Sequence, residues 1–105
     1  NPDVAAFVNQ NNREMPPQRK YRPLVITDKK PAGQFLSLSH LLDPEVRSQL
    51  ADRPEDVRIP NRPGSVFLYL PSKKLKQRVE SKTQSTLVPI TFDTNDAPWL
   101  WQVPR

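Results

Sequence analysis

Three basic residues are spaced so that a helix would align them on one face. Lys74, Arg78 and Lys82 follow one another at intervals of four residues in segment 71–85. Residues four apart lie above one another on a helix, so these side chains would form a cationic stripe. Ammonium and guanidinium groups bind phosphates and carboxylates through charge-assisted hydrogen bonds. The spacing therefore predicts a surface that binds a polyanion.

Two pairs of aromatic residues are further candidates for binding. Phe67 and Tyr69 alternate in segment 65–70 and would share one face of a strand, where they could stack on bases if that face is open. Trp99 and Trp101 fall close together near the C-terminus, and tryptophan is enriched in interface hot spots. For both pairs the alternative is packing in the core, because aromatic side chains bury large apolar areas.

The positive charge is concentrated in two islands. Residues 13–30 hold six basic residues against two acidic ones, and residues 65–85 hold five against one, in a chain with a net charge of +5. The first island adds Arg19, Lys20 and Arg22 to the candidate binding residues. Such islands indicate a polyanionic partner, or they are solvated faces that keep the protein soluble.

The residues that usually carry catalysis or bind metals are scarce. The chain has no cysteine and one histidine, His40, whose neighbours Ser39 and Asp43 could form a triad on paper, without a GxSxG elbow. The polar segment 93–96 lacks the glycine and the distal glutamate of a calcium loop. We therefore expect no enzyme activity, no cofactor, no metal site and no membrane span.

Thirteen prolines and only two glycines limit the elements that could position these residues. Proline removes a backbone donor, so short helices and strands joined by extended segments are expected. Segment 65–70 has apolar residues on both faces, which predicts a central, covered strand. Pro89 inside segment 86–93 predicts an edge strand there. The expected strands are 21–28, 34–39, 65–70 and 86–93 with an extended run at 99–105, and the expected helices are 43–51 and a second one opening at Ser72.

The strongest local helix signal surrounds Asp43. Asp43 is a suitable N-cap, Pro44 suits the first helical position, and Glu45 complements the helix dipole. Val46 and Leu50 would then share the buried face. On this interpretation Asp43→Ala costs about 0.5–2 kcal/mol through loss of the cap.

The N-terminal segment differs in composition from the remainder. Residues 1–20 are polar and contain Pro16-Pro17, which predicts a flexible, extended arm, with Val4, Phe7 and Val8 at helical spacing for one short turn that docks on a partner. Residues 21–105 are predicted to form a single small α+β domain with about four to five short strands and two short helices. A doubly wound sheet is not expected, because long helices do not alternate with the strands. The chain begins with Asn1 and not Met, which fits a trimmed domain, a processed product or an internal fragment.

Two functions fit these features. The first is a non-enzymatic protein-interaction or assembly module that docks on another protein or a larger complex through the N-terminal arm and the Trp99/Trp101 tail. The alternative is a basic module that binds RNA or single-stranded DNA through residues 65–85 and 13–30. Exposure of Phe67 and Tyr69 beside the basic stripe would distinguish the second from the first.

Overall fold

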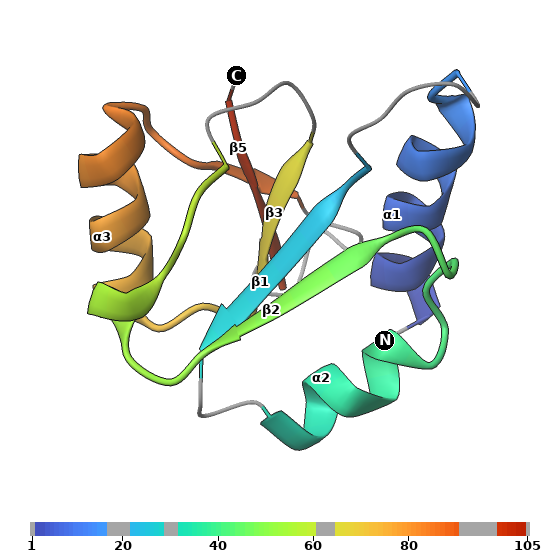
Figure 1. The fold of residues 1–105 in the computed structure, drawn as a ribbon, viewed down its shortest axis with the longest axis horizontal. Coiled ribbons are helices and arrows are strands. Elements are labelled where there is room, and N and C mark those ends of the chain that lie inside the picture. The colour runs from blue at the N-terminus through green and yellow to red at the C-terminus, as the bar shows by residue number, and fades with distance from the viewer. Residues whose placement is uncertain (1, 17–21, 29–31, 61–64, 91–98, 105) are drawn as a thin grey trace.

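Strand β3 (Val66–Tyr69) runs through the middle of the protein, and every one of its residues is buried. The computed structural model describes residues 2–16, 22–28, 32–60, 65–90 and 99–104, which form a single α+β domain with a five-stranded mixed sheet in the order β2-β1-β3-β5-β4. Figure 1 shows α1 and α2 on one face of this sheet and α3 on the other. The remaining elements are α1 (Pro2–Glu14), β1 (Leu24–Asp28), α2 (Ala32–Ser39), β2 (Arg47–Ala51), a short 3₁₀ helix η1 (Pro54–Asp56), α3 (Lys73–Thr83), β4 (Val88–Ile90) and β5 (Leu100–Val103).

The sheet combines a parallel half with an antiparallel half. β1 pairs in parallel with β2 on one side and β3 on the other, whereas β5 pairs antiparallel with β3 and β4. The parallel strands are linked by α2 and by the crossover that contains η1. Helices cover both faces of this mixed sheet, so its central strands are buried from both sides.

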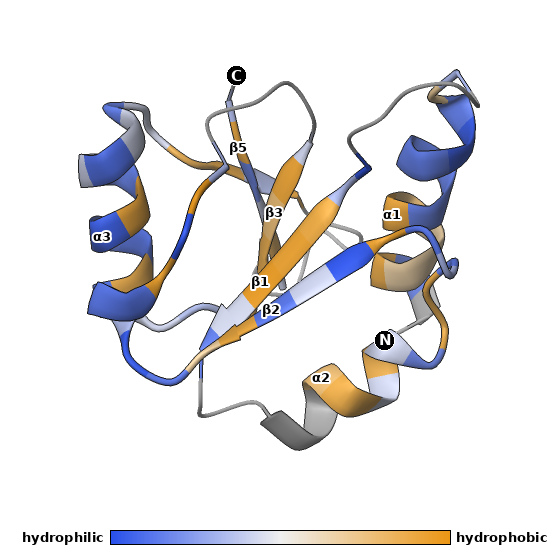
Figure 2. Ribbon diagram, viewed as in Figure 1, coloured by the Kyte–Doolittle hydropathy of each residue, from blue (hydrophilic) through white to orange (hydrophobic). Residues whose placement is uncertain are grey.

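Two hydrophobic layers hold the helices on the sheet. Val25 and Phe67 face α1 and α2, whereas Ile26 and Leu68 face α3. This alternation along β1 and β3 follows from the two-residue period of a strand, and it confirms the prediction of a central strand with cover on both sides. Figure 2 shows the same pattern, with apolar colour on the central strands and on the inner sides of the helices.

The prediction of a flexible N-terminal arm was wrong for residues 2–14, which form helix α1. Val4, Ala5 and Val8 are buried against the sheet, so the apolar side chains dock on this chain's own core and not on a partner. The polar composition of this segment was misleading, because Asn9 and Asn12 are buried as well, where α1 packs on the rest of the chain. Asn9 donates through Nδ2 to the Leu41 carbonyl at 2.8 Å and accepts at Oδ1 from the Asp43 amide at 2.7 Å.

The prediction of a strand at 34–39 was also wrong, because this segment belongs to helix α2. Phe35 and Leu38 are buried and Leu42 packs beside them, so the apolar residues follow helical spacing. Leu36, which a strand would have placed beside Leu38, is 61% exposed. Six residues are too few to separate a period of two from one of 3.6.

The predicted helix at 43–51 is absent, and residues 47–51 form strand β2. Leu50 is 49% exposed, so the expected apolar face of Val46 and Leu50 is not buried. Five residues of β2 instead pair with β1. Backbone pairing with β1 therefore outweighs the local capping signal, which is worth only about 1 kcal/mol.

Asp43 holds α1 onto the connection between α2 and β2 and does not cap a helix. Its carboxylate accepts from Arg13 Nε at 3.2 Å and a terminal Arg13 nitrogen at 3.0 Å, and from Asn12 Nδ2 at 3.2 Å. The hydrogen bonds from Arg13 are the main reason that the pKa of Asp43 is lowered. Asp43→Ala would therefore remove this contact with α1 and not a helix cap.

The lowered pKa of Asp43 makes part of the stability depend on pH. Because the pKa of Asp43 in the folded state lies below its ordinary value of 3.8, the ionised carboxylate stabilises the folded state above that pH. This contribution is lost as the pH falls through the lowered folded-state pKa. We expect Asp43→Asn to lower the urea midpoint at pH 6 and to narrow its difference from wild type at about pH 2. An equal difference at both pH values would contradict this role for the carboxylate.

The remaining sequence predictions agree better with the structure. The helix that the sequence predicted to open at Ser72 is α3, which Ser72 caps by accepting from the Leu75 amide at 3.1 Å, and Leu75 and Val79 are its buried residues. β4 contains Pro89 and is an outer strand of the sheet, as expected. Val57, which follows η1, is buried and holds this connection against the core. Among the described residues, no helix has the length and apolar character needed to cross a membrane.

Alternation along an extended run at 99–105 would place Trp99 and Trp101 on one side, but the structure places them on opposite faces of the sheet. Trp99 packs with the layer under α1 and α2, whereas Trp101 packs with the layer under α3. Leu100 and Val103 of the same segment are buried. The C-terminal tail therefore includes an interior strand of the sheet and is part of the core.

Candidate functional site

The outer face of α3 gathers the cationic side chains that the sequence singled out. Lys74, Arg78 and Lys82 are exposed along this helix, and Lys73 is exposed beside them at its start. Leu75 and Val79 anchor the opposite face in the core, which fixes the rotation of the helix about its axis. In Figure 2 the outer side of α3 is hydrophilic and its inner side is apolar. We refer to Lys73, Lys74, Arg78 and Lys82 as the α3 cationic face.

The cationic residues of α3 have no ion-pair partner among the described residues, in which the ion pairs are Arg13–Asp43 and Arg53–Asp56. Glu80, the single acid of the helix, is turned to its own chain, where Oε2 accepts from the Leu87 amide at 3.0 Å. The positive charge of the outer face is therefore not neutralised from within the helix.

Two of the basic residues of α3, Lys76 and Lys82, also have contacts within the chain. Lys76 Nζ lies 4.3 Å from the ring centroid of Trp101, which is a cation–π arrangement. Lys82 Nζ donates to the Val57 carbonyl at 3.0 Å and so ties the helix to the loop after η1. Lys73, Lys74 and Arg78 are consequently the residues of α3 whose charge is most available to a partner.

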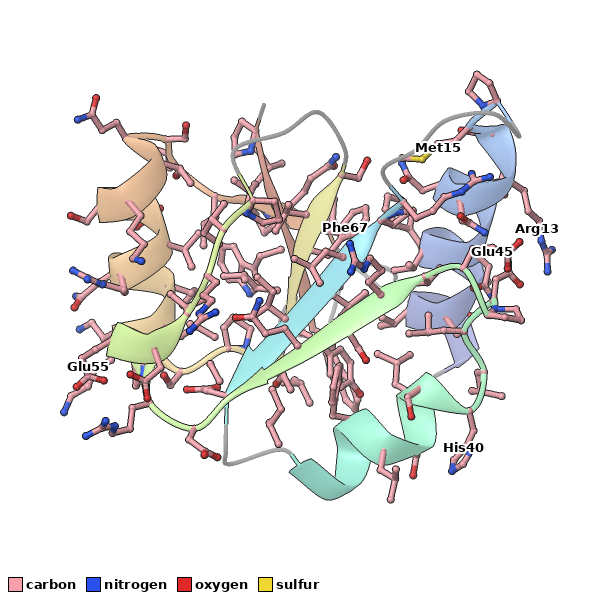
Figure 3. The ribbon with its side chains drawn as sticks, in the orientation of Figure 1. Arg13, Met15, His40, Glu45, Glu55 and Phe67 are labelled. Carbon is pink, nitrogen blue, oxygen red and sulfur yellow. The ribbon has the colours of Figure 1, made fainter. Side chains whose placement is uncertain are left out.

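The 3₁₀ helix η1 borders the α3 cationic face with negative charge. Glu55 of η1 is exposed, and Figure 3 shows it beside α3. Asp56 is held by Arg53 Nε at 3.2 Å. A polyanion on the cationic face would therefore be confined to the outer side of the helix, away from η1.

The first basic island does not add a described cluster to this face. Arg13 is engaged by Asp43, and Arg22 donates to the Asn12 carbonyl at 3.3 Å. Both contacts belong to α1, on the opposite face of the sheet from α3 (Figure 1). Arg19 and Lys20 lie outside the described residues.

Phe67 and Tyr69 are unavailable for base stacking. Both are fully buried, and both face the α1 and α2 layer, with the sheet between them and the α3 cationic face. The ring of Phe67 packs edge to face on that of Phe7, with 5.9 Å between the ring centroids. The ring centroids of Tyr69 and Phe35 are 6.3 Å apart. Burial raises the pKa of Tyr69. The open face that base stacking would require is therefore absent at this pair, which packs in the core, and Figure 3 shows Phe67 well inside the molecule.

Asp28 is a buried acid that the sequence did not single out. It lies at the carboxyl end of β1, and its Oδ1 accepts from the Ser72 amide at 3.2 Å. The neighbouring Thr27 hydroxyl donates to the Tyr69 carbonyl at 2.7 Å. The first bond holds the start of α3 against the sheet, and the second joins the ends of β1 and β3. The β-branched strand before Asp28 and the capping serine at 72 were the available signals.

The residues of the triad considered in the sequence have separate contacts. Ser39 donates its hydroxyl proton to the Leu36 carbonyl at 2.7 Å, and Asp43 is held by Arg13. His40 is exposed at the end of α2, as Figure 3 shows. Within the described part of the chain, no group of three or more His, Cys, Asp or Glu residues is placed to hold a metal ion.

No family model matches this chain, and no curated protein or solved structure matches it either. A fold of this general kind hosts many unrelated functions, so function has to be argued from the site.

Proposed function

We propose that this chain is a non-enzymatic protein-interaction module that binds an acidic surface of its partner through the α3 cationic face. The observation that carries the proposal is the outward projection of Lys73, Lys74 and Arg78 without ion-pair partners among the described residues, while Glu80 is engaged with Leu87. Complementary charges increase the association rate and help to select the partner.

The docking elements differ from those that the sequence suggested. Helix α1 and strand β5 both contribute to the buried core, so an N-terminal arm or a Trp99/Trp101 tail is not part of the proposal. The α3 cationic face lies on a helix that buried Leu75 and Val79 fix to the core and that Ser72 caps. A rigid support lowers the entropic cost of binding.

The alternative function is binding of RNA or single-stranded DNA through the same face. Its support is the same line of positive charge, which would neutralise backbone phosphates. The burial of Phe67 and Tyr69 removes the stacking residues that would have accompanied it, so we favour an acidic protein surface.

The test compares two probes and two charge-matched variants. Lys74→Gln with Arg78→Gln removes two charges from the α3 cationic face, and leaves Lys82 in place because it bonds Val57. Arg47→Gln with Arg58→Gln removes two exposed charges elsewhere. The probes are poly-L-glutamate and oligo(dT) of equal charge, measured by fluorescence anisotropy over a range of salt concentrations.

We expect poly-L-glutamate to bind at low salt and the Lys74/Arg78 variant to bind it about 5- to 30-fold more weakly. Two lost contacts of about 0.5–1 kcal/mol each correspond to such a factor. The Arg47/Arg58 control should change the affinity much less. Preferential binding of oligo(dT), with a salt slope reduced by roughly 1.4 in the Lys74/Arg78 variant, would establish the nucleic-acid alternative instead. Binding of neither probe at low salt would overturn both functions.

A further inference from the structure

The outer edge of strand β2 offers unpaired backbone groups to another strand. Among the described strands, β2 has β1 on one side and no strand on the other. In Figure 1 this edge faces the viewer. An edge strand of this kind is a template for pairing with another chain unless it is blunted by proline, a bulge or a cover. β2 contains no proline, in contrast to β4 at the other edge, which contains Pro89.

The register with β1 identifies which groups point outward. The Arg47 amide donates to the Pro23 carbonyl at 2.9 Å, so the amide and carbonyl of Arg47 point toward β1. Successive residues of a strand alternate in this direction, which turns Gln49 inward and Ser48 and Leu50 outward. The side chains of Ser48 and Leu50 are exposed, with Leu50 49% accessible.

We propose that two copies of this chain associate through antiparallel pairing of their β2 strands, with Gln49 of each copy at the two-fold axis. In this register Ser48 of one copy faces Leu50 of the other, and the converse pair follows by symmetry. Each pair exchanges two N–H···O bonds, because antiparallel neighbours whose backbone groups face each other bond in both directions. The two sheets would become one continuous sheet.

Side chains and charges favour this register. Ser48 and Leu50 pair with Val25 and Thr27 of β1 and so lie on the α1 and α2 face of the sheet. The two Leu50 side chains would then lie diagonally across the axis, roughly 7–8 Å apart, and cover each other. Just beyond the strand ends, exposed Glu45 would lie near exposed Arg53 of the other copy, which keeps its contact with Asp56 of its own chain. A parallel arrangement would place Glu45 beside Glu45 and Arg47 beside Arg47.

The α3 side of β2 is already occupied within the chain and leaves the edge itself open. Gln49 turns its side chain to residue 58, where Nε2 donates to the Arg58 carbonyl at 3.0 Å and Oε1 accepts from the Arg58 amide at 2.9 Å. Five paired residues form a small interface, so the association is of the weak, concentration-dependent class. This inference does not depend on the α3 cationic face or its partner.

Sedimentation equilibrium up to about 1 mM protein, a concentration that detects weak association, provides the first test. The apparent mass of the wild type should rise from one copy toward two. Leu50→Lys should weaken association at least about tenfold, because it brings two ammonium groups together at the axis. Val88→Lys places the same charge at 47% exposed Val88 on the opposite edge, and association should be unchanged. Ser48→Pro, which removes an outward amide only, should also abolish association.

Amide hydrogen exchange gives a readout specific for the register. Exchange at Ser48 and Leu50 should slow as the protein concentration rises, whereas the Gln49 amide, which points toward β1, should not change. A monomer at about 1 mM would overturn the proposal. So would a dimer in which Ser48 and Leu50 exchange at the monomer rate, or one that Leu50→Lys leaves intact.

Discussion

Phe67→Ala is expected to lower the free energy of unfolding by about 3–5 kcal/mol, the range for removal of a buried phenylalanine. Phe67 is fully buried on β3 and packs edge to face on Phe7, so truncation leaves a cavity between the sheet and the helices. Since small domains have a total stability of about 5–15 kcal/mol, the variant should be close to unfolding. Urea denaturation followed by circular dichroism measures the change.

The matched control is Phe7→Ala on helix α1. Phe7 is 37% exposed, so the same truncation should cost clearly less than at Phe67. A loss below about 1 kcal/mol for Phe67→Ala would mean that its ring is not enclosed in solution, which would return it to the candidates for base stacking.

The fold could be predicted from the sequence only where a segment carries a clear local pattern of apolar residues. The β-branched and aromatic run of β3 and the capped, amphipathic α3 were predicted correctly, because a strand buried on both faces and a helix with a stripe of two apolar residues have clear local patterns. The predicted class, a small α+β domain, also agrees with the structure.

The α2 and β2 segments were interchanged because their identities depend on neighbours that are distant in sequence. α2 is helical because Phe35, Leu38 and Leu42 pack on the sheet, and β2 is extended because β1 pairs with it. The local signals, alternation in one segment and a cap at Asp43 in the other, were too weak to oppose these tertiary contacts. Asp43 instead joins Arg13 and Asn12, which lie 30 and 31 residues away in the sequence.

The candidate site was predicted only in part, for a related reason. The spacing of Lys74, Arg78 and Lys82 determines that they share one helical face, so this feature could be predicted from the sequence alone. Which face of the sheet Phe67 occupies depends on where α1 packs, and α1 was expected to be an arm. Phe67 and the α3 cationic face lie on opposite sides of the sheet. This arrangement depends on where α1 and α3 pack, so it could not be derived from the sequence.

Deletion of residues 98–105 is expected to abolish cooperative folding. These residues include β5, which lies between β3 and β4 and pairs with both. Leu100 and Val103 are at most 1% exposed. Burial of these two side chains contributes about 3–6 kcal/mol, which is comparable with the whole stability of a small domain. The deletion would also leave the edge of β3 unpaired and β4 without its neighbour.

Urea denaturation and near-ultraviolet circular dichroism distinguish this result from the behaviour of a docking tail. The truncated chain should lack a cooperative transition, whereas Trp101→Ala, which removes one half-buried ring and its contact with Lys76, should keep one at a lower urea midpoint. A tail that served only to anchor a partner could be removed without loss of the transition. If the truncated chain retained the wild-type midpoint, β5 would not be part of the core, and Trp99 and Trp101 would again be candidates for contact with a partner. The expected loss instead follows from the place of β5 inside the sheet, where its backbone and side chains are enclosed together.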